Sequence, residues 1–142
     1  MRDRFPILVH TVLCRGDRVL LLRRAHTGFL DGWYALPGGH LERGEGIRNC
    51  AIRECAEEVG VVVRPDALEP LAALAYRTGE DQGVNFLFAC RRFDGEPRIA
   101  EPDLFDDLRW CRPDAFPAQT VGYVEEALRM SVRKLWFRDV EA

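Results

Sequence analysis

The sequence predicts an α/β fold, an α/β/α sandwich in which a central mixed β-sheet is covered by one helix on each face. Three observations favour this fold. Stretches rich in Val, Leu and Ile alternate with two segments that carry apolar residues at helical spacing, turn residues separate these stretches, and no internal repeat or low-complexity linker is present. The 142 residues, 47% of them hydrophobic, suffice for one core, so a single domain over residues 1–142 is expected.

The chain opens with two predicted strands. Residues 7–14 and 18–24 are rich in Val, Leu and Ile and are separated by the short polar link RGD, which predicts a β-hairpin. Residues 25–33 contain two glycines and predict a loop. Residues 34–36 predict a short strand that Pro37 ends, because a proline ring pushes the preceding residue towards extended geometry.

The next predicted element is a helix over residues 46–58. Ala51, Cys55 and Val59 recur at every fourth position and would share one face of that helix. Gly60 follows at a typical C-terminal capping position, because glycine readily adopts left-handed backbone angles.

Further strands and a second helix complete the predicted fold. Residues 71–77 and 84–93 predict strands, and the nearly continuous apolar character of the second indicates burial on both faces. Residues 107–113 predict a strand ended by Pro113, and residues 121–134 carry apolar side chains at helical spacing.

Composition narrows the function classes. The net charge is −3 with both signs interspersed, so no broad basic field favours duplex nucleic acid. The apolar stretches near the N-terminus are short and broken by charges, which predicts a soluble protein without a membrane partner. The five cysteines are odd in number and form no C-x-x-C pair, which favours reduced thiols in the cytoplasm over a zinc site. The three histidines are scattered and are given no catalytic role.

Glutamates are concentrated on the first predicted helix. Relative to Glu54, Glu57 lies at about −60° and Glu58 at about +40° around the helix axis, so the three carboxylates share one stripe. Each such like-charge pair weakens a helix by a few tenths of a kcal/mol, and Arg53 alone cannot neutralise three carboxylates. A hard divalent cation such as Mg²⁺ or Mn²⁺ can, because it prefers oxygen ligands.

A glycine-rich loop, LPGGHLERGEG, precedes this helix. Glycines allow backbone amides or carbonyls to approach a ligand closely, and Glu45 can reach back from the end of the loop. The alternative for the acidic stretch alone is a solvated helix face, since surface helices are often rich in glutamate.

The whole string over residues 39–61 resembles the signature of the Nudix hydrolases, which we call the box. That signature is Gly, five residues, Glu, seven residues, then Arg-Glu-apolar-any-Glu-Glu-any-Gly-apolar. The matching positions are Gly39, Glu45, Arg53, Glu54, Cys55, Glu57, Glu58, Gly60 and Val61. Cys55 departs from the aliphatic residue usual in the family, but a small buried thiol fits the same space. Outside the box, TVLCRGDRVLLLRR looks like the family's opening hairpin and LRW like its penultimate strand.

The resemblance implies a Nudix fold with a loop-helix-loop that binds metal. It also implies hydrolysis of a phosphoanhydride bond in a nucleoside diphosphate linked to another group, with Mg²⁺ or Mn²⁺ as cofactor. Glu54, Glu57 and Glu58 would be the metal carboxylates, and the carbonyl of Gly38 would join them. Glu54 would also activate the attacking water.

Two further box residues would support the reaction. Arg53 would orient a glutamate of the box, and Glu45 would brace the loop or assist through water. An additional acidic metal ligand from outside the box is expected at Glu101, with Asp103 and Glu80 as alternatives; solvation of surface acids explains any one of these equally well.

Substrate contacts are expected at five positions. Arg23 and Arg24 end the second strand and could clamp phosphates, although ordinary charged strand ends look the same. Gly39 lies in the glycine-rich loop, Tyr76 could stack on a base, and Asn85 could read a base edge or be a buried amide satisfied by backbone.

Substrate identity is the least determined expectation. The compact size favours a nucleoside or deoxynucleoside triphosphate pyrophosphohydrolase, with hydrolysis of dinucleoside polyphosphates, nucleotide sugars or ADP-ribose as alternatives. RNA decapping ranks low because no extended basic tract is present. A non-catalytic nucleotide sensor is the alternative of another class. The expected partners are a small nucleotide and, as a homodimer, a second copy of the chain.

Overall fold

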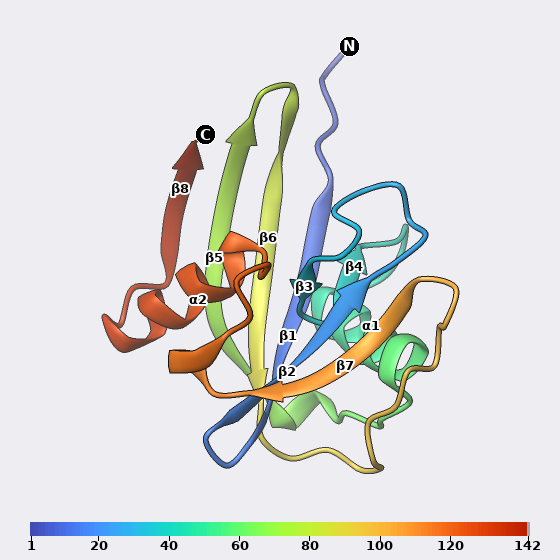
Figure 1. The fold of residues 1–142 in the computed structure, drawn as a ribbon. Coiled ribbons are helices and arrows are strands. Elements are labelled where there is room, and N and C mark those ends of the chain that lie inside the picture. Colours follow the sequence, from blue (N-terminus) through green and yellow to red (C-terminus); the bar gives the residue numbers. More distant parts are fainter. Residues whose placement is uncertain (142) are drawn as a thin grey trace.

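The computed structural model describes residues 1–141 and confirms the predicted mixed α/β sandwich (Figure 1). The strands are β1 (Ile7–Arg15), β2 (Arg18–Arg24), β3 (Tyr34–Ala35), β4 (Gly38–His40), β5 (Leu68–Thr78), β6 (Asp81–Cys90), β7 (Phe105–Cys111) and β8 (Phe137–Glu141). The helices are α1 (Ile47–Val59) and α2 (Gly122–Val132), and short 3₁₀ turns occur at Pro65–Ala67 and Pro113–Ala115.

The sheet is mixed because β1 has neighbours of both directions. Its main strand order is β3-β2-β1-β6-β5-β8, with β4 paired to β1 and β7 paired to β2. β1 runs antiparallel to β2 and β4 but parallel to β6, and β8 lies parallel to β5. Figure 1 shows β5, β6 and β8 side by side, with β4 and α1 beyond β1. β1 therefore joins the two halves of the sheet.

Alternate side chains of β1 enter two separate cores, one under each helix. Val9 and Leu13 belong to the core that contains Cys55 of α1, whereas Val12 belongs to the core that contains Val124 of α2. The predicted helix on each face of the sheet is confirmed.

Several element boundaries differ from the sequence prediction. The strand expected at 84–93 ends at Cys90, and the strand expected at 107–113 covers Phe105–Cys111 instead. Residues 38–40, expected in a loop, pair with β1 as β4, and β8 was not expected at all. Both missed strands depend on pairing with distant segments rather than on their own β-propensity.

The helix boundaries follow local chemistry. Gly60 has a left-handed φ of 70° and its N–H donates to the carbonyl of Ala56 at 3.1 Å, which confirms the predicted cap of α1. Neither helix within residues 1–141 is long and apolar enough to cross a bilayer. All five cysteines are buried and free.

Shortening a core side chain should destabilise the fold measurably. Leu21 is fully buried in the α2-side core, so Leu21→Ala should lower the free energy of unfolding by about 2–5 kcal/mol, since it removes buried methyl groups and leaves a cavity. Urea denaturation measures this loss. Val132→Ala, at a position 85% exposed, is the control and should change stability by less than about 0.5 kcal/mol; equal losses in both variants would contradict the assigned core.

Candidate functional site

The two glycines of β4 allow its backbone to lie close to two neighbours. Gly38 lies against β1, and Gly39 lies against Glu54 of α1. A Cβ on Gly39 would lie 2.5 Å from Oε1 of Glu54, and a Cβ on Gly38 would lie 2.2 Å from the carbonyl oxygen of Val9. A Cβ at Gly38 would clash with backbone, so glycine is required there, whereas a Cβ at Gly39 would displace the carboxylate of Glu54. The backbone of β4 thereby lies directly against a carboxylate of α1.

The helix α1 presents its glutamates in two environments. Glu54 and Glu58 are 9% and 5% exposed, whereas Glu57 is exposed on the outer side. Oε2 of Glu58 accepts a hydrogen bond from the backbone N–H of Gly38 at 2.9 Å. The predicted stripe of three carboxylates thus consists of two buried members and one exposed member.

Arg53 connects the loop to the helix. Its Nε and Nη2 donate to the two carboxylate oxygens of Glu45 at 2.6 and 3.0 Å, a bidentate pair. Its Nη1 donates to Glu54 at 3.0 Å and to Glu57 at 3.2 Å, and its Nη2 also reaches the carbonyl of His40 at 3.2 Å. This geometry fits the orienting and bracing roles expected for Arg53 and Glu45.

Burial and charge act in opposite directions on these carboxyl groups. Burial, followed by the negative charge of Glu54, raises the pKa of Glu58 well above its ordinary value. Burial also raises the pKa of Glu54, although Arg53 opposes that rise. The hydrogen bond from Arg53 lowers the pKa of Glu45 to about 2. The buried pair is therefore costly to ionise without a further positive charge.

The site offers carboxylate oxygens as donors for a divalent cation. Within residues 1–141, no three His, Cys, Asp or Glu side chains form a ready-made metal-binding group, because Glu57 bonds to Arg53 on the outer side of the helix while Glu54 and Glu58 face inward. The available donors are nonetheless all oxygens, and the single charge of Arg53, which also bonds Glu45 and Glu57, does not offset both buried carboxylates, so the chemistry fits Mg²⁺ or Mn²⁺.

Glu101 approaches the same carboxylates from the loop before β7. The N–H of Ala100 donates to the carbonyl of Glu58 at 3.0 Å, which attaches this loop to the end of α1. Burial, followed by the negative charges of Glu57 and Glu54, raises the pKa of Glu101. The structure thus brings Glu101 towards the box, while Glu80 lies in the distant β5–β6 turn.

The arginines expected to clamp phosphates are engaged in local contacts. Nε of Arg23 donates to Asp106 at 2.6 Å, and its guanidinium lies 5.8 Å from the ring centre of Tyr34. Nε of Arg24 donates to the carbonyl of Phe29 at 2.8 Å and so shapes the 25–33 loop. A phosphate would have to compete with these partners.

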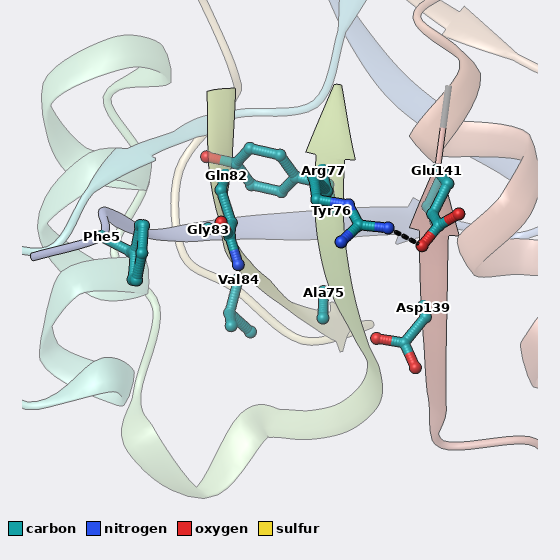
Figure 2. A pocket seen from close by; sticks show the side chains of 10 residues that line it. Phe5, Ala75, Tyr76, Arg77, Gln82, Gly83, Val84, Asp139 and Glu141 are labelled. Atoms are coloured by element: carbon teal, nitrogen blue, oxygen red, sulfur yellow. Dashed lines mark hydrogen bonds and ion pairs between the residues drawn. The ribbon is translucent and has the colours of Figure 1, made fainter. Parts of the chain in front are cut away.

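The two expected base contacts lie in different places. Tyr76 lines a pocket of about 210 Å³ with Phe5, Gln82 and Asp139, and no box residue lines that pocket (Figure 2). Asn85 is 4% exposed, and its Oδ1 accepts a hydrogen bond from Nδ1 of His10 at 2.8 Å. The oxygen of this amide therefore bonds a histidine side chain and not, as the alternative interpretation expected, backbone.

His10, for which the sequence predicts no catalytic role, lies beside Gly38 of β4. Its ring lies 4.7 Å from that of Tyr123, centre to centre, and is directly opposite Gly38 in the β1–β4 pairing. Burial lowers the pKa of His10 to about 4, so the ring is neutral near pH 7. In the sequence, only its position two residues before Val12 indicates that His10 shares a face of β1 with a core residue.

Replacing Glu58 tests the cost of the buried pair. A raised folded-state pKa means that stability is fully present below the ordinary pKa of about 4.5 and is lost as pH rises through the folded value. Glu58→Gln keeps an oxygen acceptor for the Gly38 N–H but carries no charge. It should therefore stabilise the metal-free protein more at pH 8 than at pH 5, by urea denaturation with chelator present.

The exposed Glu125 of α2 provides the matched control, since Glu125→Gln changes an equal charge in water. An equal gain at both pH values for Glu58→Gln would show that the buried carboxyl is not costly to ionise.

A family model, curated relatives and solved structures all relate this chain to the same family. The NUDIX domain family model matches residues 4–130. The chain is 30% identical over 107 residues to the NAD-capped RNA hydrolase NudC of Stutzerimonas stutzeri, covering 75% of this chain but only 36% of that protein. It is 34% identical over 100 residues to a Mycobacterium tuberculosis protein whose name assigns it as an 8-oxo-dGTP diphosphatase, covering 67% of each.

A solved structure agrees with this comparison. The crystal structure of a MutT NUDIX hydrolase from Burkholderia pseudomallei superposes with a TM-score of 0.82 at 25% identity, over 89% of this chain and 98% of that one.

Proposed function

This chain belongs to the NUDIX domain family, and on that premise we propose that it hydrolyses a phosphoanhydride bond in a nucleoside diphosphate linked to another group. The first substrate class is a nucleoside or deoxynucleoside triphosphate, cleaved with release of pyrophosphate. The partner is then a small nucleotide, and the buried free thiols fit a reducing compartment such as the cytoplasm.

One observation carries this proposal: two buried carboxylates, Glu54 and Glu58, lie against the glycine backbone of β4 without enough positive charge to offset them. A structural role alone would not favour two adjacent buried acids, because burying uncompensated charge is costly. A cation and its phosphate ligand would supply the missing charge balance.

The residues of the site have two roles, binding the metal and activating the attacking water. Glu54, Glu57, Glu58 and the Gly38 carbonyl would hold Mg²⁺ or Mn²⁺, with Glu101 as a further ligand. When bound, the metal neutralises phosphate charge and lowers the pKa of a water. Glu54 would accept the proton of the attacking water.

Arg53 and the backbone of β4 set the geometry for that proton transfer. Arg53 lies 3.0 Å from Glu54 and favours its ionised form, which a general base requires. The Gly38 N–H fixes the carboxylate of Glu58, and the Arg53–Glu45 pair holds the loop on the helix.

Substrate binding is proposed for Gly39, Asn85, Arg23, Arg24 and Tyr76 in descending order of structural support. Gly39 contacts Glu54 directly, whereas the two arginines already have protein partners. Tyr76 lies in a pocket that the box does not line, which makes it the weakest candidate.

The relatives' names indicate a shared bond rather than a shared substrate. NAD-capped RNA and 8-oxo-dGTP both contain a phosphoanhydride bond, but they differ in base and leaving group. Because the chain spans about a third of the NudC relative, that protein's activity is an alternative to test alongside dinucleoside polyphosphates, nucleotide sugars and ADP-ribose.

A nucleotide sensor remains the alternative of another class. A protein that only binds needs no residue to activate water, yet here every charged position of the box is present and Arg53 is bonded to three of its glutamates. This retention favours an enzyme.

Glu54→Gln tests the catalytic assignment. Phosphate and pyrophosphate release should be measured across a panel of nucleoside triphosphates, dinucleoside polyphosphates, nucleotide sugars, ADP-ribose and NAD-capped RNA. Wild type should turn over one class only with Mg²⁺ or Mn²⁺. The variant should lose at least about 100-fold in kcat, the range expected for removal of a general base.

Glu125→Gln, an exposed change of the same type, should retain wild-type turnover. Full metal-dependent activity in Glu54→Gln would refute its role as base. Silence of wild type on the whole panel, with nucleotides still raising the melting temperature, would favour the sensor.

A further inference from the structure

The peptide of Gly38 lies between two side chains that approach it separately. On one side its N–H donates to Glu58 at 2.9 Å. On the other, a Cβ on Gly38 would lie 2.5 Å from Cδ2 of His10, so the imidazole ring occupies the room that a side chain would need. The two residues are direct partners across β1 and β4.

The His10 ring is itself fixed by two neighbours. Its Nδ1 donates to Oδ1 of Asn85 at 2.8 Å, across 75 positions of sequence. The Tyr123 ring of α2 lies against it at 4.7 Å between centres, with 41° between the planes. A hydrogen bond and a ring contact together leave the imidazole little rotational freedom.

Tyr123 is also tied to the segment that leads into β4. Its hydroxyl accepts a hydrogen bond from the N–H of Leu36 at 3.3 Å, two residues before Gly38. The cluster of His10, Asn85 and Tyr123 therefore contacts β4 directly at Gly38 and just upstream at Leu36.

We propose that His10, held by Asn85 and Tyr123, is a positioning residue that fixes the Gly38 amide and through it the carboxylate of Glu58. His10 does not touch the reacting atoms. Its contribution to catalysis rests on the function proposed above, whereas its control of the Gly38 amide does not.

A purely structural role for His10 predicts a different effect of substitution on the Gly38 peptide. If the ring served only to fill the core, a leucine of similar bulk would leave the Gly38 peptide in place. If His10 positions that peptide, loss of the Asn85 bond should release it even when the fold is intact, because the buried amide of Asn85 then loses its partner.

The test compares His10→Leu, Asn85→Leu and His10→Asn with Val12→Ala. The leucine variants remove the hydrogen bond, whereas His10→Asn places an amide donor close to the position of Nδ1. Val12 is the control because it is buried on the same face of the same strand. The readouts are the ¹H–¹⁵N resonance of the Gly38 amide in metal-free protein, the melting temperature, and kcat and KM on the best substrate.

Both leucine variants should move the Gly38 amide proton upfield, as its bond to Glu58 weakens. His10→Leu should also lower kcat about tenfold with KM within about twofold, because it disturbs the proposed metal ligand Glu58 without removing a proposed substrate contact. Asn85→Leu is judged by the Gly38 resonance alone, since Asn85 is also a proposed substrate contact. His10→Asn should recover part of both changes. Val12→Ala should lower the melting temperature but leave the Gly38 resonance and kcat near wild type.

An unmoved Gly38 resonance in folded His10→Leu, no recovery of that resonance in folded His10→Asn, or the same shift in Val12→Ala would overturn the proposal. So would a moved resonance with unchanged kcat in an active enzyme. If wild type has no turnover, the proposed function fails, and the amide resonance alone still decides whether His10 positions Gly38.

Discussion

The structure depends on one constraint: two buried carboxylates must lie beside each other against the two glycines of β4. Glu54 reaches this place because Gly39 has no side chain, and Glu58 is held there by the N–H of Gly38. The loop before α1, its bridge through Arg53 and the docking of the Glu101 segment all surround that contact. The shape of the site is thus determined by backbone proximity as much as by charge.

The same contact makes the site a source of instability. Burial raises the pKa values of Glu54 and Glu58, so the ionised pair weakens the fold that holds it. The bidentate Arg53–Glu45 pair and the two apolar cores compensate for this cost. A protein that retains such a pair exchanges stability for the capacity to bind positive charge.

The sequence predicted the parts of this arrangement that depend on local spacing. The helical period of Ala51, Cys55 and Val59, the box and the Gly60 cap need only neighbouring residues, and the structure has each as expected. The sequence does not predict contacts across the sheet, because no local pattern indicates that His10 pairs with Gly38 or that Asn85 bonds to His10. Tyr76 was grouped with the site for its chemistry alone, and the sheet places it in another pocket.

The parallel pairing of β1 with β6 has a consequence for the order in which the molecule forms. Residues 7–13 pair with residues 84–90, so a loop of more than half the chain must close before this central contact exists. Closing a long loop loses chain entropy before the contacts that offset this loss have formed, and this slows folding. The Asn85 contact to His10 belongs to this late step, whereas the α1 helix and the β1–β2 hairpin form from nearby residues. In a nascent chain the glutamates of α1 therefore stay in water until the central sheet has formed.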